Sequence, residues 1–278
     1  MKLVRFGNRG FEKPGIVDSA GNLRDASQII PDFLPETVGP DLIERLKCAD
    51  LPVVDAKGLR FGAPLARSGT IWCVGLNYAL HAKEAGLPIP EEPILFSKAA
   101  GTLCGPNDDI LFADGMTKLD WEVELAIVIG TPALRVEAGS ALEHVLGYAI
   151  VNDVSERAWQ MERGGQWMKG KSFPNFCPLG PSIVTADEVG DPQSLHLWLE
   201  VNGERLQDGN TDDMIFSVAA IISYMSQFTR LMPGDIICTG TPSGVGAGFD
   251  PPRWLKPGDR VRLGIDGLGV QEQTVAAL

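Results

Sequence analysis

The sequence has few cysteines, and none lies in a spacing that builds a site. The five are scattered along the chain with no CxxC pair, so neither a disulfide framework nor a zinc site is predicted. We expect reduced, buried side chains that pack as small hydrophobic groups: Cys48, Cys73, Cys104, Cys177 and Cys238.

Basic residues are also in the minority. The chain holds 24 Lys and Arg against 36 Asp and Glu, a formal net charge of −12, and this balance argues against a nucleic-acid partner. No segment approaches the roughly 18 consecutive apolar residues of a membrane span. The start, MKLVRFGNRGFEKPG, has neither the apolar core nor the cleavage site of a signal peptide. The sequence therefore predicts a soluble, cytoplasmic protein without a membrane partner.

What the chain does have is an ordinary globular composition. It contains 278 residues, 44% hydrophobic and 22% charged, which is enough for one large core or two unequal domains. Short strands and a helix around residues 41–48 fill the N-terminal part, and the character of the sequence changes near Ala66. We predict a small N-terminal domain over residues 1–66 and a catalytic domain over residues 67–278.

Strand-like runs with Gly, Pro, Asn or Asp at the breaks dominate the larger domain. Asn202-Gly203 and Asp266-Gly267 predict two hairpins. Convincing helices are confined to three segments, residues 78–85, 155–163 and 214–228. The pattern predicts a mixed, β-rich fold closed on itself with short helices, rather than alternating βαβ units.

The stretch KLDWEVELAIVIG, residues 118–130, places two glutamates in an apolar run. Strict alternation predicts a strand with Glu122 and Glu124 on one face. Their stems lie about 6.6 Å apart on a strand that rises ~3.3 Å per residue, so both carboxylates can converge on one cation but repel each other without it. Because burial of an uncompensated carboxylate costs several kcal/mol, the strand predicts a positively charged partner.

A third acid, Asp153, ends the run GYAIVNDVS just before a predicted helix. One interpretation is a helix cap, because Glu156 follows in capping-box spacing. The other is a metal ligand, since three oxygen ligands without Cys or His suit Mg²⁺, Mn²⁺ or Ca²⁺. So small a ligand set leaves room for water and substrate, which fits a catalytic Mg²⁺ site.

Two residue pairs on predicted helices have both a catalytic and an ordinary interpretation. Arg157 and Gln160 share a helix face with the preceding acid, where they could grip a carboxylate substrate or form a solvated face. His81 and Glu84, at i and i+3, could form a general base oriented by an acid, or a surface pair of a common kind. Asn77 is the expected N-cap of the helix predicted over residues 78–85, which carries His81 and Glu84.

The segments KGKSFPNFCPLG and TGTPSGVGAG carry weaker signals. Lys169 and Lys171 lie among Phe and Pro residues, where a partly desolvated lysine could hold a carboxylate or an enolate oxygen, although most lysines are simply solvated. The second segment follows a strand and could offer backbone N–H groups to an anion. It lacks the GxxxxGK spacing of a nucleotide loop, and by itself it indicates only a turn.

Together and in this order, the motifs resemble the fumarylacetoacetate hydrolase family over about residues 70–270. They are GLNYALHAKEAG, LDWEVELAIVIG, GYAIVNDVSERAWQ, KGKSFPNFCPLGP, VNGERLQDGNT and PGDIICTGTPSGVG. The resemblance implies a β roll of stacked sheets preceded by a small N-terminal domain, usually in a homodimer. It also implies that Mg²⁺ or Mn²⁺ is held by Glu122, Glu124 and Asp153, that His81 and Glu84 activate water, that Lys171 contacts substrate and transition state, and that Arg157, Gln160 and Thr241 belong to the pocket.

One segment departs from the family pattern. SERAWQMERGGQWMKGK stands where many relatives have SARDxQ, and it resembles members that act on 2,4-diketo-3-deoxy sugar acids such as the rhamnonate or fuconate derivatives. The resemblance therefore implies a metal-dependent hydrolase that cleaves a C–C bond of such a small-molecule 2-oxo acid, giving pyruvate and a hydroxy acid.

Other functions stay open at this point. Acylpyruvate or fumarylpyruvate hydrolysis and oxaloacetate decarboxylation all use a metal-chelated 2-oxo acid. A cation or sugar-acid binding module without catalysis would explain the acids, but not a paired His81 and Glu84 beside them.

Overall fold

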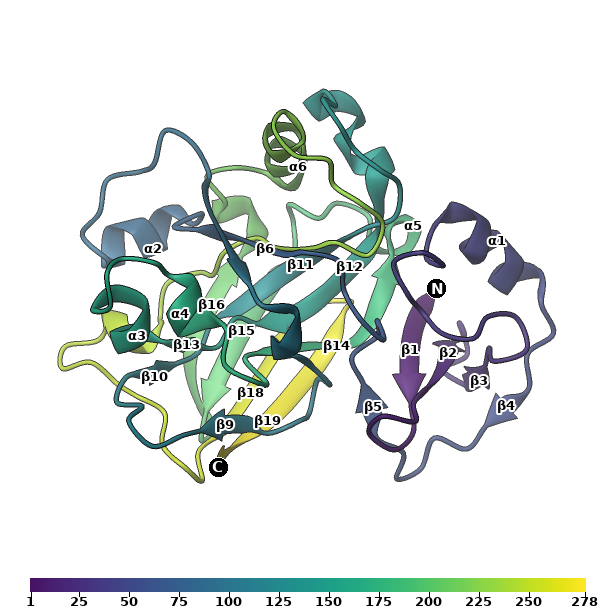
Figure 1. Ribbon diagram of the computed structural model, residues 1–278, viewed down its shortest axis with the longest axis horizontal. Helices are drawn as coiled ribbons and strands as arrows, with labels where there is room; N and C mark the ends of the chain where they lie inside the picture. The colour runs from purple at the N-terminus through teal and green to yellow at the C-terminus, as the bar shows by residue number, and fades with distance from the viewer.

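The computed structural model describes all 278 residues and consists of stacked sheets with short helices (Figure 1). The longest sheet has a path of strands in the spatial order β4 (Val53–Val54), β3 (Leu23–Asp25), β2 (Lys13–Val17), β1 (Lys2–Phe6), β14 (Cys177–Thr185), β12 (Val145–Asn152), β11 (Val123–Ile129), β17 (Ile236–Cys238), β6 (Ile71–Gly75) and β7 (Ile94–Lys98). Off this path, β5 (Phe61–Gly62) pairs with β1, and β8 (Leu103–Cys104) pairs with β14.

The second sheet runs in the order β16 (Glu204–Asn210), β15 (His196–Val201), β18 (Arg260–Ile265), β19 (Gly269–Ala277) and β9 (Ile110–Phe112). Both predicted hairpins are confirmed, because β15 pairs with β16 and β18 pairs with β19. Asn202 and Gly203 have φ of 53° and 84°, the positive values that a tight two-residue hairpin turn requires. A separate two-stranded pair joins β10 (Leu119–Asp120) and β13 (Ser155–Glu156).

The helices are few and short, so the predicted mixed, β-rich fold class is confirmed. They are α1 (Pro40–Cys48), α2 (Ala79–Glu84), α3 (Arg157–Met161), α4 (Met168–Lys171), α5 (Ala186–Val189) and α6 (Val218–Ser226), with 3-10 turns η1 (Ala100–Thr102), η2 (Ala138–His144), η3 (Thr211–Asp213) and η4 (Gly246–Gly248). None of the helices has the length and apolar character needed to cross a membrane.

Strand β11 separates two hydrophobic cores, and its predicted alternation is confirmed. Leu125 and Ile127 pack into the core that also contains the inward residues of β15 and β18. Ala126 and Val128 pack into the core on the opposite face of the long sheet. The acidic end of β11 therefore starts between two packed layers, which holds its side chains in fixed directions.

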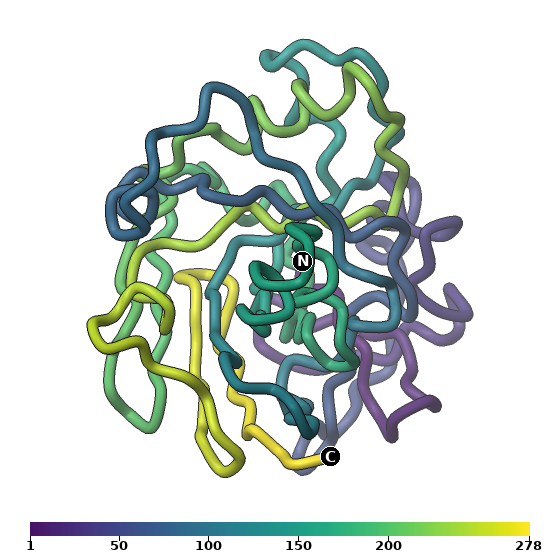
Figure 2. The backbone as a smooth tube through the Cα atoms, turned by 60° about the vertical axis from the view of Figure 1, so that its left-hand side comes forward, coloured from purple at the N-terminus to yellow at the C-terminus, as the bar shows by residue number.

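The N-terminal strands extend the long sheet through β1, which pairs antiparallel with β14 in the register Lys2 to Val184. Leu3, Ile16 and Leu42 of α1 pack in the same core as the far face of β11. Figures 1 and 2 show this purple N-terminal part to one side of the yellow C-terminal hairpin. A domain division at residue 66 stays a prediction.

Two predicted helices begin later than the sequence indicated. Over residues 155–163, the first two residues form β13, and the side chain of Glu156 caps α3 by accepting from the Ala158 N–H at 3.2 Å. Over residues 214–228, α6 begins only after Ser217, whose hydroxyl oxygen accepts from the Ala220 N–H. In both cases a side chain able to accept hydrogen bonds terminates the extended segment.

The predicted N-cap Asn77 is wrong, because α2 begins after Tyr78. The fully buried side chain of Asn77 instead donates to the carbonyls of Phe216 and Thr239, at 3.1 and 2.8 Å, and accepts from the Phe216 N–H at 2.8 Å. It thus ties the chain before α2 to two remote segments.

All five cysteines are free thiols, and four of them are buried as predicted. Cys48 is exposed. It ends α1, whose buried face carries Leu42, Ile43 and Leu46, and at about 100° per residue it points away from that face.

Candidate metal and catalytic site

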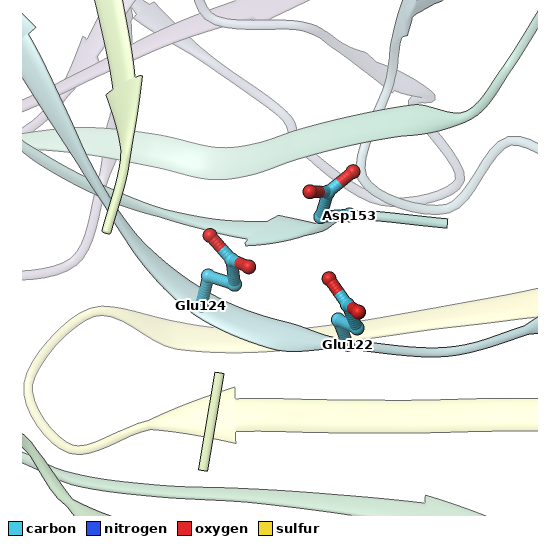
Figure 3. Close-up of side chains that lie close together, drawn as sticks. All are labelled: Glu122, Glu124 and Asp153. Atoms are coloured by element: carbon cyan, nitrogen blue, oxygen red, sulfur yellow. The ribbon is translucent and has the colours of Figure 1, made fainter. Parts of the chain in front are cut away.

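Three carboxylates converge beside the start of β11 (Figure 3). Glu122 precedes the strand, Glu124 lies within it, and Asp153 directly follows β12, the neighbouring strand. One oxygen of each residue lies within 4.8 Å of the others, and the side chains are buried. The Asp153 N–H donates to the Glu122 carbonyl at 2.9 Å, which holds the two strand ends in register. The structure therefore brings together the three acids that the sequence proposed as ligands.

Two buried lysines neutralise part of this charge. Lys171 Nζ donates to Glu122 Oε2 at 2.7 Å and to Asp153 Oδ2 at 2.9 Å. Lys98 Nζ donates to Asp153 Oδ1 and, at 3.2 Å, to the Val154 carbonyl. Burial opposes the charge on Lys171, but Asp153 and then Glu122 outweigh it and raise the pKa of its ammonium group. Lys98 was not predicted, because a single lysine in the run ILFSKAAG has no distinguishing pattern.

Glu124 is the member of the cluster without a basic side chain bound to it. Its Oε2 accepts only the Gly240 N–H, at 2.9 Å. Burial, and then repulsion from Asp153 and Glu122, raises the pKa of Glu124 well above its ordinary value. Glu122 is buried as well, yet Lys171 and then Arg157 outweigh that effect and lower its pKa. The cluster offers only oxygen ligands, and Glu124 has no basic side chain to neutralise it. Both features fit a hard divalent cation.

Arg157 is held by Asp120 rather than exposed on a solvated helix face. Its Nε donates to Asp120 Oδ2 at 2.8 Å, and its Nη1 donates to Gln160 Oε1 at 3.1 Å. Nη2 lies 2.6 Å from Glu122 Oε1, as an ion pair without good hydrogen-bond alignment. The side chain is only 13% exposed. Gln160 is buried and its Nε2 has no protein acceptor, so this N–H is free to meet a ligand.

His81 and Glu84 form a direct pair on α2. His81 Nδ1 lies 3.0 Å from Glu84 Oε2, and Glu84 Oε1 accepts the Gly244 N–H at 2.8 Å. A Cβ at Gly248 would lie 2.4 Å from Glu84 Cδ, so this glycine makes room for the carboxylate. Since Glu84 accepts from Nδ1, the proton of a neutral imidazole belongs there and the lone pair is on Nε2, which has no protein partner.

The loop TGTPSGVGAG does bind anions, but they are the protein's own carboxylates. The N–H groups of Gly246 and Ala247 donate to the two oxygens of Asp120 at 2.6 and 3.1 Å. Together with the contacts to Glu84 and Glu124 described above, one loop positions three acids. This role was not predicted, since sequence spacing does not show which carboxylates meet the loop.

The cap interpretation of Asp153 is wrong. Its carboxylate is occupied by the two lysines, and the first turn of α3 is capped by Glu156. Glu156 Oε1 also accepts from the N–H groups of Thr117 and Lys118, each at 3.1 Å. Glu156 therefore fixes the chain before β10, and Asp153 is left for the acidic cluster.

Two acids of the cluster, Glu122 and Glu124, face a pocket of about 320 Å³, whereas Asp153 lies behind its lining. Among the predicted residues, the pocket is lined by His81, Glu84, Glu122, Glu124, Arg157, Gln160, Lys171 and Thr241. The Thr241 hydroxyl donates to the Val123 carbonyl at 2.9 Å and accepts from Gln207 Nε2 at 2.8 Å. Its proton is therefore engaged inside the protein, and a substrate contact by Thr241 stays a prediction.

Asp120 is expected to be essential for stability. Changing Asp120 to Ala removes the buried carboxylate that accepts from Arg157, Gly246 and Ala247. We expect the free energy of unfolding to fall by about 3–5 kcal/mol, the cost of leaving one member of a buried ion pair unpaired, measured by urea unfolding. Glu91→Ala, at an exposed site without a hydrogen bond, is the control. A loss below about 1 kcal/mol, typical of an exposed pair, would contradict this role.

Comparisons with known proteins agree with this geometry. A family model described as "Fumarylacetoacetate (FAA) hydrolase C-terminal" matches residues 70–276. A relative from Burkholderia multivorans, provisionally named a hydrolase, is 53% identical over 281 residues, covering 100% of this chain and 99% of its own.

Two solved structures have the same fold along the whole chain. Fumarylacetoacetate hydrolase from Exiguobacterium antarcticum is 37% identical with a TM-score of 0.87, and the match covers 100% of both chains. A 2-hydroxyhepta-2,4-diene-1,7-dioate isomerase from Mycobacterium marinum is 32% identical with a TM-score of 0.79, covering 100% of this chain and 98% of that one.

Proposed function

The chain belongs to the fumarylacetoacetate hydrolase family, and from this membership and the geometry we propose that it is a divalent-metal-dependent hydrolase of 2,4-dioxo acids. The similar proteins named above include a hydrolase and an isomerase. The observation that supports hydrolysis is that one pocket is lined both by Glu122 and Glu124, two acids of the oxygen-only cluster, and by the His81–Glu84 pair. A binding module would have no use for that pair.

Glu122, Glu124 and Asp153 would hold Mg²⁺ or Mn²⁺. When bound, such a cation supplies Lewis-acid stabilisation of the negative charge that develops on the leaving fragment. Lys98, Lys171 and Arg157 would remain bound to Glu122 and Asp153. Glu124 would then be the ligand whose negative charge is not already neutralised by a basic side chain.

His81 would act as the general base. Its Nε2 takes a proton from water, and Glu84 holds the ring and stabilises the resulting imidazolium through Nδ1. The oxygen of that water bonds to C4 of the substrate, the C3–C4 bond breaks, and its electron pair leaves on the pyruvate enolate. Protonation of the enolate at C3 gives pyruvate, and the C4 fragment leaves as a carboxylic acid.

Gln160 and Lys171 would position the substrate. The free Nε2–H of Gln160 can donate to a carboxylate or 2-oxo oxygen. Lys171 has three N–H donors and uses two of them on Glu122 and Asp153, so the third can meet an enolate oxygen. Both side chains line the same pocket as His81.

The finer identity of the substrate is a proposal from sequence resemblance, namely a 2,4-diketo-3-deoxy sugar acid of the rhamnonate or fuconate type. Acylpyruvates, including fumarylpyruvate, share the same reacting atoms. Oxaloacetate decarboxylation needs the enolate stabilisation but no attacking water, so the His81–Glu84 pair favours hydrolysis over it. A homodimer also stays a proposal that rests on the family resemblance, and light scattering in solution tests it.

Removing the metal is expected to abolish this reaction reversibly. Incubation with EDTA should stop the loss of diketone absorbance of a 2,4-dioxo acid, and added Mg²⁺ or Mn²⁺ should restore it, because three clustered carboxylates cannot stabilise a developing anion unaided. The readout is initial rate before and after dialysis against each ion. Full activity in EDTA at unchanged rate would contradict the metal-dependent assignment.

A further inference from the structure

The pocket has a charged inner end and an apolar mouth. Glu122, Glu124 and Lys171, which line its inner end, are at most 5% exposed. Leu87 and Met161, which line it as well, are 49% and 58% exposed. A substrate whose 2-oxo acid group lies at the inner end must therefore place its other end among apolar side chains.

No lysine or arginine lines the mouth. Arg157 and Lys171 are the only Arg and Lys residues of the pocket lining, and both are bound to acids at its inner end. Two other basic residues belong to the same segment but not to the lining: Lys169 donates to the Arg163 carbonyl, and the Arg163 guanidinium lies 5.6 Å from the Trp159 ring. A carboxylate carried into the mouth would meet no counter-charge.

Trp167 forms a fixed wall of this mouth. Its ring packs edge-on against Phe96, with centroids 5.4 Å apart. A Cβ at Gly75 would lie 2.5 Å from Trp167 Cζ3, so the ring lies directly on the backbone of β6. Gly164 and Gly165, with φ of 78° and 71°, turn the chain between α3 and this tryptophan, a conformation that glycine adopts without strain.

We propose that this mouth selects 2,4-dioxo acids whose group beyond C4 is short, uncharged and apolar at its tip, and rejects those that carry a second carboxylate. The proposal rests on the proposed function and specifies its substrate class. The rhamnonate and fuconate derivatives fall inside the class, because each carries one carboxylate and ends in a methyl group. A dioate, such as the 1,7-dioate in the name of the similar isomerase, falls outside it.

A matched substrate pair tests the selection. The acid 2,4-dioxoheptanoate and the diacid 2,4-dioxoheptane-1,7-dioate differ only in a terminal methyl group against a carboxylate. We expect kcat/KM to favour the monoacid by about 10-fold, because the diacid would place a charge without a basic partner beside the partly exposed apolar side chains of the mouth. Equal rates, or a preference for the diacid, would overturn the selection while leaving the hydrolase assignment intact. If neither acid is cleaved, both proposals fall.

A charge placed in the mouth should reverse part of this preference. Met161→Lys puts an ammonium group at the exposed rim, and we expect it to narrow the monoacid-to-diacid ratio by about 3-fold, mainly through KM for the diacid. Met168→Lys adds the same charge on the same segment at a residue outside the pocket lining, and should leave the ratio unchanged. If both variants shift the ratio equally, the effect is general surface charge and the mouth is not the determinant.

The contact of Trp167 with the substrate tail is tested by comparing a long and a short substrate. Trp167→Ala should lower kcat/KM for 2,4-dioxoheptanoate by about 10-fold, since it removes apolar contact with the tail, and change that for 2,4-dioxopentanoate much less. The same loss for both substrates would show that Trp167 acts on the site as a whole rather than on the tail.

Discussion

Replacing Glu124 with alanine is expected to abolish turnover and to weaken Mg²⁺ or Mn²⁺ binding by more than about 100-fold, beyond the loss typical of a residue that only supports a ligand. Glu124 is the acid of the cluster that no basic side chain neutralises; it receives only the Gly240 N–H. Without Glu124, the cluster keeps only Glu122 and Asp153, and both of these carboxylates already form ion pairs with Arg157 or Lys171. Calorimetric titration with each ion measures the effect.

Stability separates loss of a ligand from loss of the fold. Without a cation, the Glu124 carboxylate is buried and repelled by Asp153 and Glu122, so the alanine variant should be at least as stable as the parent in EDTA. Added Mg²⁺ should raise the Tm of the parent, because only the folded state holds the site, and should not raise that of the variant. Glu91→Ala serves as the charge-matched control. Parent-like affinity for both ions in Glu124→Ala would remove Glu124 from the ligand set.

Replacing His81 with alanine should reduce hydrolysis of a 2,4-dioxo acid by on the order of 10²–10⁴-fold, the usual contribution of a positioned general base. Metal binding should be unchanged, since His81 is not among the clustered acids. Any metal-assisted decarboxylation of oxaloacetate should survive better, because that reaction needs no attacking water. Rates on both substrates, with the Mg²⁺ affinity as a control, measure the difference.

Glu84→Gln tests the pair as a unit. The amide keeps the size of the side chain but removes the negative charge opposite the imidazolium, so hydrolysis should fall less than in His81→Ala, and the double variant should be no slower than His81→Ala alone. Independent losses that multiply in the double variant would show that the two residues do not act together. Parent rates of hydrolysis in His81→Ala would contradict the role of His81 as the general base.

Local periodicity was sufficient to predict two of the three acids of the cluster, Glu122 and Glu124. Alternation placed Glu122 and Glu124 on one face of a strand, and the structure shows Trp121, Val123 and Leu125 in the core on the other side. The hairpin at Asn202-Gly203 was equally local, because its turn depends on two adjacent residues. Asp153 had two interpretations: the structure excludes the helix cap, because two lysines bind its carboxylate and Glu156 caps α3, and its role as a metal ligand stays a prediction.

What could not be predicted depends on segments that meet from far apart in the sequence. Lys98 and Asp120 carry no local signature, yet one binds Asp153 across 55 positions and the other accepts from Gly246 across 126 positions. Helix ends were misplaced where a side chain outside the periodic pattern, such as Ser217, fixed the first turn. The pairing of β1 with β14 was equally invisible, because strand order is set by the packed layers rather than by the strands themselves.

Product analysis tests the central claim most directly. Wild-type protein is incubated with Mg²⁺ and 2,4-dioxopentanoate, and the mixture is followed by proton NMR. Hydrolysis of the C3–C4 bond predicts that each diketone consumed yields one pyruvate and one acetate, with no product in EDTA. An unconsumed diketone, or pyruvate without an equal amount of acetate, would contradict the account.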